Sequence, residues 1–206
     1  CGCGGGTSRN QNNQQAADSA KTTCAASAQA VILDTDLGSS TDDVVLMACL
    51  YNLMDQGTVD LKAIMVNREG ATNAKLADIM NTYYKHAEIP IGLVKNGKKD
   101  PRVFIDYWKM AESKTYTDEP EMPRSLSDSE IAQLPDACQL YRKTLSEAKD
   151  SSVTIFSIGF ATNLAHLLES GPDSISRLSG IDLVKNKVKA IYLQAGHFGK
   201  GLEPDY

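Results

Sequence analysis

The chain has 206 residues, of which 42% are hydrophobic and 23% charged, and this is enough for one domain with a buried core. Its formal net charge of −5 and the lack of a dense Lys/Arg run weigh against a nucleic-acid partner, because nucleic acids are bound mainly through basic patches. No apolar stretch approaches the length needed to span a bilayer.

Residues 1–29 are rich in Gly, Ser, Asn, Gln, Ala and Thr and contain almost no large apolar residue. Such a segment cannot bury enough surface to offset the entropy lost on ordering, so it is predicted to be a flexible tether. An N-terminal Cys1 before a polar linker resembles a bacterial lipoprotein. That resemblance implies lipidation of Cys1, export to the periplasm or the outer membrane, and membrane contact only through the lipid. The alternative is a trimmed or engineered terminus.

An Asp-rich stretch follows the tether and lies between two apolar runs. Residues 31–33 are predicted to form a short buried strand and residues 38–40 a loop. A helix is expected from there, with Thr41 as its N-cap.

Four carboxylates fall within ten positions of this stretch: Asp34, Asp36, Asp42 and Asp43. Asp34 and Asp36 are two apart at a strand end and share a side, while Asp42 and Asp43 lie in the first helical turn, so all four are able to converge. Crowded carboxylates raise one another's pKa unless a cation or hydrogen-bond donors compensate them. Oxygen ligands without Cys or His favour Ca²⁺ or Mg²⁺ over zinc.

The rest of the chain alternates strands with helices. Strands are predicted at residues 61–66, 89–94, 153–158 and 188–193, and helices at residues 44–54, 74–84, 104–113, 134–149, 164–168 and, as one short helix, within 171–187. Residues 95–101 are predicted to be a basic polar loop. This pattern predicts an α/β fold with an open, mostly parallel, doubly wound sheet and helices on both faces.

Sites in such sheets gather at the carboxyl ends of the strands. That rule predicts one rim made of Asp34, Asp36, Asn67, Thr162, Asn163 and the loop at residues 194–201.

Three segments in order resemble the inosine-uridine-type nucleoside hydrolases. The first is an Asp-x-Asp strand end, a Gly loop and an Asp-Asp pair opening a helix, here from Asp34 to Asp43. The second is a strand ending in a Gly-x-x-Thr-Asn turn at residues 153–165, and the third a strand and glycine turn at residues 192–196. The resemblance covers residues 30–206 and implies a nucleoside-hydrolase-like α/β domain.

The resemblance also implies a reaction: hydrolysis of the N-glycosidic bond of a nucleoside or related riboside by a calcium-activated water. Ca²⁺ would be held by Asp36, Asp43 and the backbone carbonyl of Thr162, with Asp34 in support. Asp36 would also be the general base, and Asp42 would bind the ribose hydroxyls. Carboxylates and a metal suit this chemistry, because the transition state is an oxocarbenium-like sugar attacked by water.

The chain departs from the family pattern in two regions. The Asn expected after the second strand is replaced by Gly70, so that Asn67 or Asn73 would substitute for it only in a rearranged loop. Asp205 opens an acidic-aromatic motif that implies a further sugar contact, and the family's His-Asp pair falls beyond residue 206. The domain at 30–206 is therefore expected to be incomplete at its C-terminus.

The sequence is also compatible with other functions. One is a calcium-dependent sugar- or nucleoside-binding lipoprotein, or an inactive fragment, without turnover. Another is a Mg²⁺-dependent phosphohydrolase of the haloacid-dehalogenase type, since Asp34 and Asp36 resemble its nucleophile motif, although Gly38 does not fit and Asp42 and Asp43 go unexplained. Helix capping and a favourable interaction with the helix dipole would by themselves explain Asp42 and Asp43. Homo-oligomer formation is also left open.

Overall fold

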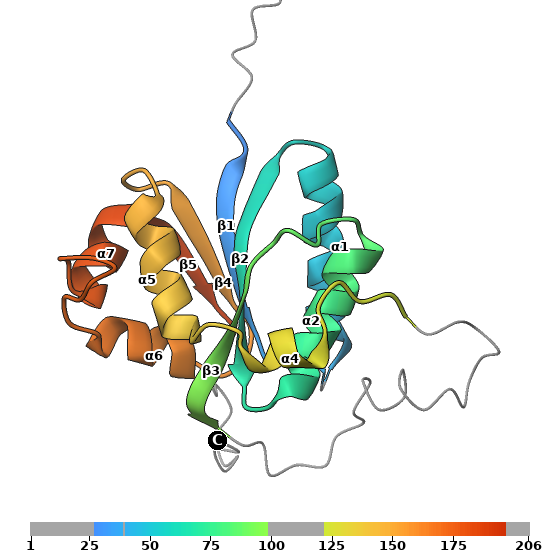
Figure 1. Ribbon diagram of the computed structural model, residues 1–206. Helices are drawn as coiled ribbons and strands as arrows, with labels where there is room; N and C mark the ends of the chain where they lie inside the picture. Colours follow the sequence, from blue (N-terminus) through green and yellow to red (C-terminus); the bar gives the residue numbers. More distant parts are fainter. Residues whose placement is uncertain (1–26, 39, 99–121, 197–206) are drawn as a thin grey trace, which may run out of the picture.

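The computed structural model describes residues 27–38, 40–98 and 122–196. Five strands form one sheet in the order β3-β2-β1-β4-β5, and every pairing is parallel (Figure 1). The strands are β1 (Gln29–Thr35), β2 (Val59–Arg68), β3 (Ile91–Lys98), β4 (Val153–Ser157) and β5 (Val188–Leu193). The helices are α1 (Thr41–Asp55), α2 (Ala71–Tyr83), α4 (Asp128–Ala132), α5 (Ala137–Glu147), α6 (Thr162–Glu169) and α7 (Gly180–Lys187).

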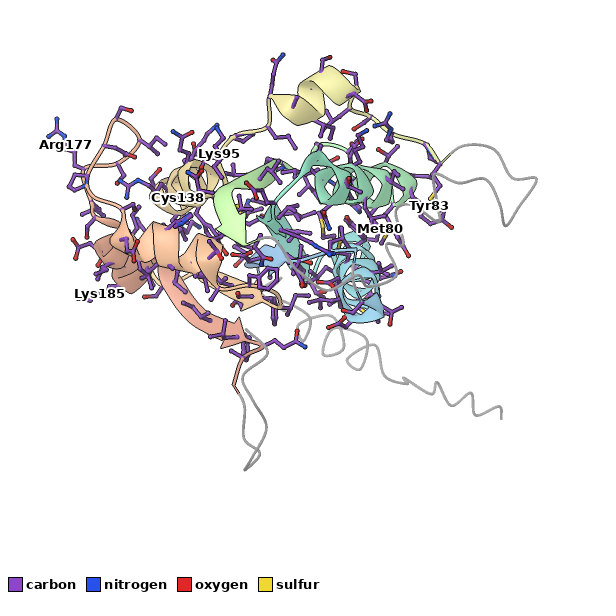
Figure 2. The ribbon with its side chains drawn as sticks, turned by 90° about the horizontal axis from the view of Figure 1, so that it is seen from below. Met80, Tyr83, Lys95, Cys138, Arg177 and Lys185 are labelled. Carbon is purple, nitrogen blue, oxygen red and sulfur yellow. The ribbon has the colours of Figure 1, made fainter. Side chains whose placement is uncertain are left out.

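Helices cover both faces of the sheet, because successive strand residues point to opposite sides. Val31 and Leu33 of β1 pack into a core with residues of α1, α2 and α4. Ile32, between them, packs into a second core with residues of α5, α6 and α7. The two helix layers lie on opposite sides of the sheet when the molecule is seen from the side or from below (Figures 1 and 2). The predicted doubly wound α/β fold is confirmed.

The direction of strand addition reverses once. The chain builds β1, β2 and β3 outward on one side, and β4 then pairs with the other edge of β1. In open parallel sheets, ligands bind outside the carboxyl ends of the strands at such a switch point. A ligand-binding site is therefore expected at the carboxyl ends of β1 and β4.

Several predicted boundaries were wrong. Ser40, not Thr41, is the N-cap of α1, and its side chain makes no capping hydrogen bond to the helix. The predicted loop from residue 95 begins later, because β3 continues to Lys98. The predicted helix at 134–149 begins only at Ala137, because the carbonyl of Pro135 accepts a hydrogen bond from the Leu93 amide of β3 at 2.9 Å. The predicted helix at 104–113 lies outside the described residues.

The described helices include none that is both long and apolar enough to cross a membrane. The edge strand β5 nevertheless exposes three large apolar side chains, Ile191, Tyr192 and Leu193.

Candidate functional site at the carboxyl ends of β1 and β4

The ends of β1 and β4 are joined directly at the switch point. Asp34 is opposite Ser157 in the parallel register, and the Ile158 amide donates to the Asp34 carbonyl at 2.9 Å. A Cβ atom on Gly159 would lie 2.5 Å from the Asp36 amide nitrogen, so only glycine allows the turn after β4 to approach Asp36 this closely. The packing thus places Asp36 against the turn that leads to Thr162.

Asp34 is fully buried at the centre of this junction. Its Oδ1 accepts hydrogen bonds from Asn67 Nδ2 at 2.7 Å and Asn163 Nδ2 at 3.1 Å. Its Oδ2 accepts from the Tyr141 hydroxyl at 2.9 Å. Burial raises the pKa of Asp34 to about 7, although the three donors oppose this rise.

Asp43 lies in the first turn of α1 and is also fully buried. It accepts hydrogen bonds from the hydroxyl of Thr35 and, at 3.4 Å, from the hydroxyl of Ser40. Burial raises the pKa of Asp43 to about 7, and the charges of Asp36 and Asp42 add to the rise. Burial is thus the main cause of the raised pKa of Asp43, and the two neighbouring acids contribute less.

Asp42 differs from Asp43 because its side chain is exposed. The Ser40 hydroxyl donates to it and lowers its pKa below the ordinary value. Gln194, the first residue after β5, reaches its other oxygen with Nε2 at 3.5 Å. Asp42 is thus an ionised carboxylate at the surface of the site, and Asp36 is half-buried.

The two candidate asparagines have separate tasks. Asn67 bonds to Asp34 through Nδ2, and its Oδ1 accepts from the Phe160 amide at 3.2 Å. Asn73 donates to the Leu37 carbonyl and leaves no room for a Cβ on Gly38, which has a φ of 116°. Asn67 therefore links Asp34 to the turn after β4, whereas Asn73 holds the loop between Asp36 and α1.

Thr162 is the first residue of α6 and is half-buried. Its neighbour Asn163 is buried, and this residue connects the start of α6 to Asp34. The predicted rim therefore comes together as far as it is described, from Asp34 through Asn67 and Asn163 to Gln194. Asp205 and Cys1 lie outside the described residues, as does the rest of the loop beyond Gly196.

A metal ion requires a matching set of donors. Within the described ranges, no three His, Cys, Asp or Glu side chains form a group that could hold a metal ion. The predicted ligand set is Asp36, Asp43 and one backbone carbonyl, and neither Asp34 nor Asp42 completes a group of three carboxylates with them. Two buried polar atoms beside Asp34, Ser157 Oγ and Asn163 Oδ1, have no hydrogen-bond partner in the part of the chain that the structure describes.

Two contributors to the site were missed by sequence reasoning, Tyr141 and Thr35, and a third, Gln194, was not singled out. Tyr141 has the spacing of an ordinary core residue in a helix, and nothing in its sequence context indicates a partner 107 positions away. The signal for Thr35 was its place between Asp34 and Asp36. Gln194 was included only as part of a loop.

A cavity of about 740 Å³ lies elsewhere, at the amino ends of the strands. Its lining includes Gln29, Asp60, Lys62, Lys143 and Lys189, and it contains none of the four carboxylates discussed above. We therefore place the candidate site at the switch point, where the buried carboxyl groups Asp34 and Asp43 lie, and not in this cavity.

Comparison with known proteins identifies the fold. No family model matches the chain, and no curated protein matches it. Among solved structures, a plant nucleoside hydrolase, PpNRh1, is similar with a TM-score of 0.55 and 20% sequence identity over 82% of this chain and 48% of that one. The type III effector protein XopQ, solved with adenosine diphosphate ribose, is similar with a TM-score of 0.59 and 18% identity, over 82% and 43%. The effector protein XOO4466 is similar with a TM-score of 0.59 and 17% sequence identity, over 82% of this chain and 44% of that one.

The chain therefore has a nucleoside-hydrolase-like α/β fold. It spans less than half the length of each of these structures. At identities of 20% and below, the likeness establishes the fold alone, and the inosine-uridine-type specificity stays a prediction.

Proposed function

We propose that the chain carries a calcium-dependent centre for hydrolysing the N-glycosidic bond of nucleosides or related ribosides. One observation carries the proposal: the Asp-rich stretch that ends β1 and opens α1 lies at the β1/β4 switch point of a nucleoside-hydrolase-like fold, where burial and the charge of Asp36 raise the pKa of Asp43. Carboxylates in this position suit a reaction in which positive charge develops on a sugar.

The donor types at the site are those that Ca²⁺ prefers, although no three acidic, His or Cys side chains of the described residues form a group that could hold a metal ion. Asp43 is buried and accepts hydrogen bonds from the neutral hydroxyls of Thr35 and Ser40, while burial and, to a smaller extent, the charges of Asp36 and Asp42 raise its pKa. A hard cation would relieve this repulsion, and carboxylate and carbonyl oxygens are the ligands it prefers. Asp36, Asp43 and the Thr162 carbonyl would hold the ion. When bound, Ca²⁺ would lower the pKa of a water molecule and orient the sugar diol.

The chain's own residues then have distinct tasks. Asp36 would accept the proton of the attacking water through its carboxylate. Asp42, exposed and ionised, would accept hydrogen bonds from ribose hydroxyls, with Gln194 beside it. Asp34 has all its hydrogen bonds directed into the protein, so it would support the site without contacting substrate.

The proposal is tested by ribose release from inosine and nitrophenyl-riboside, measured with and without Ca²⁺, for the 206-residue chain and for the longest native form of the protein. We expect Ca²⁺-dependent release that Asp36→Asn reduces by at least about 100-fold, because general-base catalysis contributes about 10²–10⁴. Asp60→Asn, at the opposite end of the sheet, is the matched control and should retain activity. No release from any form would refute the proposal.

Binding of a riboside without turnover is the second candidate. It is supported by XopQ, a structural neighbour that was solved with adenosine diphosphate ribose. Thermal stabilisation by adenosine diphosphate ribose, with no ribose release from any nucleoside, would favour binding over hydrolysis.

The phosphohydrolase alternative loses support. It requires Asp34 as a nucleophile, but this side chain is fully buried and both of its oxygens accept hydrogen bonds. An attacking carboxylate must reach its substrate, and Asp34 has no such access.

A further inference from the structure

The amino-end cavity, the hollow of about 740 Å³ described above, lies at the opposite end of β1 and β4 from the Asp-rich stretch. Its volume is in the range of about 300–1,000 Å³ that is typical of sites for small organic molecules. Part of the lining is apolar and consists of Ala30, Pro90, Leu140, Ala148 and Val153. An apolar group therefore has a surface to pack against in this cavity.

The charged part of the lining has an excess of positive charge. It consists of four lysines and two acids: Lys62, Lys143, Lys149, Lys189, Asp60 and Glu147. Lys62 and Asp60 form an ion pair at 2.5 Å and neutralise each other. Three lysines then remain against one acid, although the chain as a whole has a formal net charge of −5. Within the described ranges, Lys143, Lys149 and Glu147 make no side-chain hydrogen bond or ion pair.

Gln29 holds Lys189 at the wall of the amino-end cavity. Lys189 Nζ donates to Gln29 Oε1 at 3.2 Å, and Gln29 Nε2 donates to the Ser152 carbonyl at 2.5 Å. All three residues line the cavity. These bonds fix one ammonium group beside the starts of β1 and β4.

The loop before β4 is held in one conformation. The amides of Ser151 and Ser152 donate to the carbonyls of Asn186 and Lys187 at 2.8 and 3.0 Å, which ties the loop to the end of α7. Ser151 has a φ of 50°, in the left-handed region that a residue other than glycine adopts only where the surrounding structure enforces it. Because both serines line the cavity, this part of its wall is formed before any ligand binds.

Complementarity with helix dipoles does not account for these lysines. Cations stabilise a helix from its last turn, but α5 has no basic residue there, and Lys143 lies further back. Lys189 belongs to a strand. Lys149 alone, next to the C-cap Ala148, fits that role.

We propose that the amino-end cavity binds a small organic anion, a molecule with an apolar body and one carboxylate or phosphate group. The apolar body would pack against Leu140 and Val153, and the lysines would neutralise the anionic group. Glu147 would oppose binding of the anion, because it is a like charge in the same lining. The inference does not depend on the function proposed for the switch point.

Isothermal titration of the 206-residue chain with a series of simple probes tests whether both parts of the ligand are needed. From butanoate through hexanoate to octanoate, the affinity should rise by about fourfold for each methylene that is buried. Octan-1-ol has the chain without the charge and should bind at least about 10-fold more weakly than octanoate. Octyl phosphate, compared with octanoate, decides which anionic group the lysines prefer.

Variants with opposite expected effects locate the binding. Lys143→Gln combined with Lys189→Gln should weaken octanoate binding by at least about 10-fold, because two of the lining cations are lost. Glu147→Gln should strengthen it by about two- to fivefold, because a repulsive charge is removed. The matched control combines Lys95→Gln and Lys185→Gln, two exposed lysines outside the lining, and should leave the affinity unchanged (Figure 2).

Urea denaturation of each variant shows whether it is folded. Tighter binding by Glu147→Gln cannot result from damage to the fold, so it supports the proposal even where the double lysine variant is unstable. The absence of saturable octanoate and octyl phosphate binding would overturn the proposal. Octanoate binding that responds equally to the lining pair and the control pair, and not to Glu147→Gln, would also overturn it.

Discussion

Asp34, Asp42 and Asp43 carry the same side chain but lie in different surroundings. Asp42 is exposed and its pKa is lowered, whereas burial raises the pKa of Asp34 and of Asp43 to about 7. The sequence pattern predicted that these acids converge, since strand and helix periodicity decide which way they point. It did not predict their environments: the sequence placed Asn67 and Asn163 on the same rim but did not indicate that they and Tyr141 donate to Asp34.

The raised pKa values predict a pH dependence of stability in the metal-free protein. The folded-state pKa of about 7 for Asp34 and Asp43 exceeds the ordinary value of 3.8, so the folded state binds more protons than the unfolded chain between these limits. The free energy of unfolding should therefore fall as the pH rises from about 4 to about 7. Urea denaturation at a series of pH values measures this slope.

Two comparisons check the cause of the slope. Asp43→Asn should make it shallower, because one of the two protonation sites is gone. Saturating Ca²⁺ should also flatten it, because the ion favours ionised carboxylates. A slope that neither change affects would show that other groups are responsible.

Gly159 tests the close contact between β1 and the turn after β4. In Gly159→Ala, the new Cβ would lie 2.5 Å from the Asp36 amide nitrogen and 2.7 Å from Asn67 Oδ1. We expect a loss of about 1–3 kcal/mol in the free energy of unfolding, the usual cost of overpacking. Gly171→Ala is the matched control, because its Cβ would meet nothing within 4 Å. Equal stability of the two variants would contradict the contact.

At the scale of elements, the strands were predicted well and the helices less well. All five strands were found because apolar, β-branched runs between polar turns leave few alternatives. The helix at 134–149 was placed too early, since periodicity cannot reveal that Pro135 is bonded to β3. The short helix α4 was missed, although Ser127 and Glu130 form a capping box at its start.

Helix α5 is held in place by a buried arginine. The side chain of Arg142 is 2% exposed and donates to Asp173, Ser170 and the carbonyls of Ser176 and Leu178. Arg142 therefore fastens α5 to the connector between α6 and α7. The position of Tyr141 depends on this attachment.

Arg142→Met should destabilise the protein. The carbonyls of Ser176 and Leu178 lose a buried donor, and unsatisfied groups of this kind cost about 1–3 kcal/mol. Lys187→Met removes an ion pair whose partner, Asp150, is 78% exposed, and should cost less than about 1 kcal/mol. Thermal and urea unfolding of both variants checks the difference, and an Arg142→Met variant as stable as Lys187→Met would refute the stabilising role of Arg142.

For the whole molecule, the decisive feature is the reversal of strand order beside β1. It brings the Asp-rich stretch against the turn that precedes α6, and two helix layers enclose the junction. The alternation of strands and helices was enough to predict this architecture and the rim that carries the site. This chain covers less than half the length of each solved structure to which its fold was compared.

The most direct test of the central claim is a crystal structure of the protein with Ca²⁺ and a slowly hydrolysed nucleoside analogue. The account predicts one ion bound by Asp36, Asp43 and the Thr162 carbonyl, with the ribose hydroxyls against Asp42 and with Asp34 still bonded to Tyr141. A structure at saturating Ca²⁺ in which the ion binds elsewhere, or the analogue occupies the cavity at the amino ends of the strands, would contradict it.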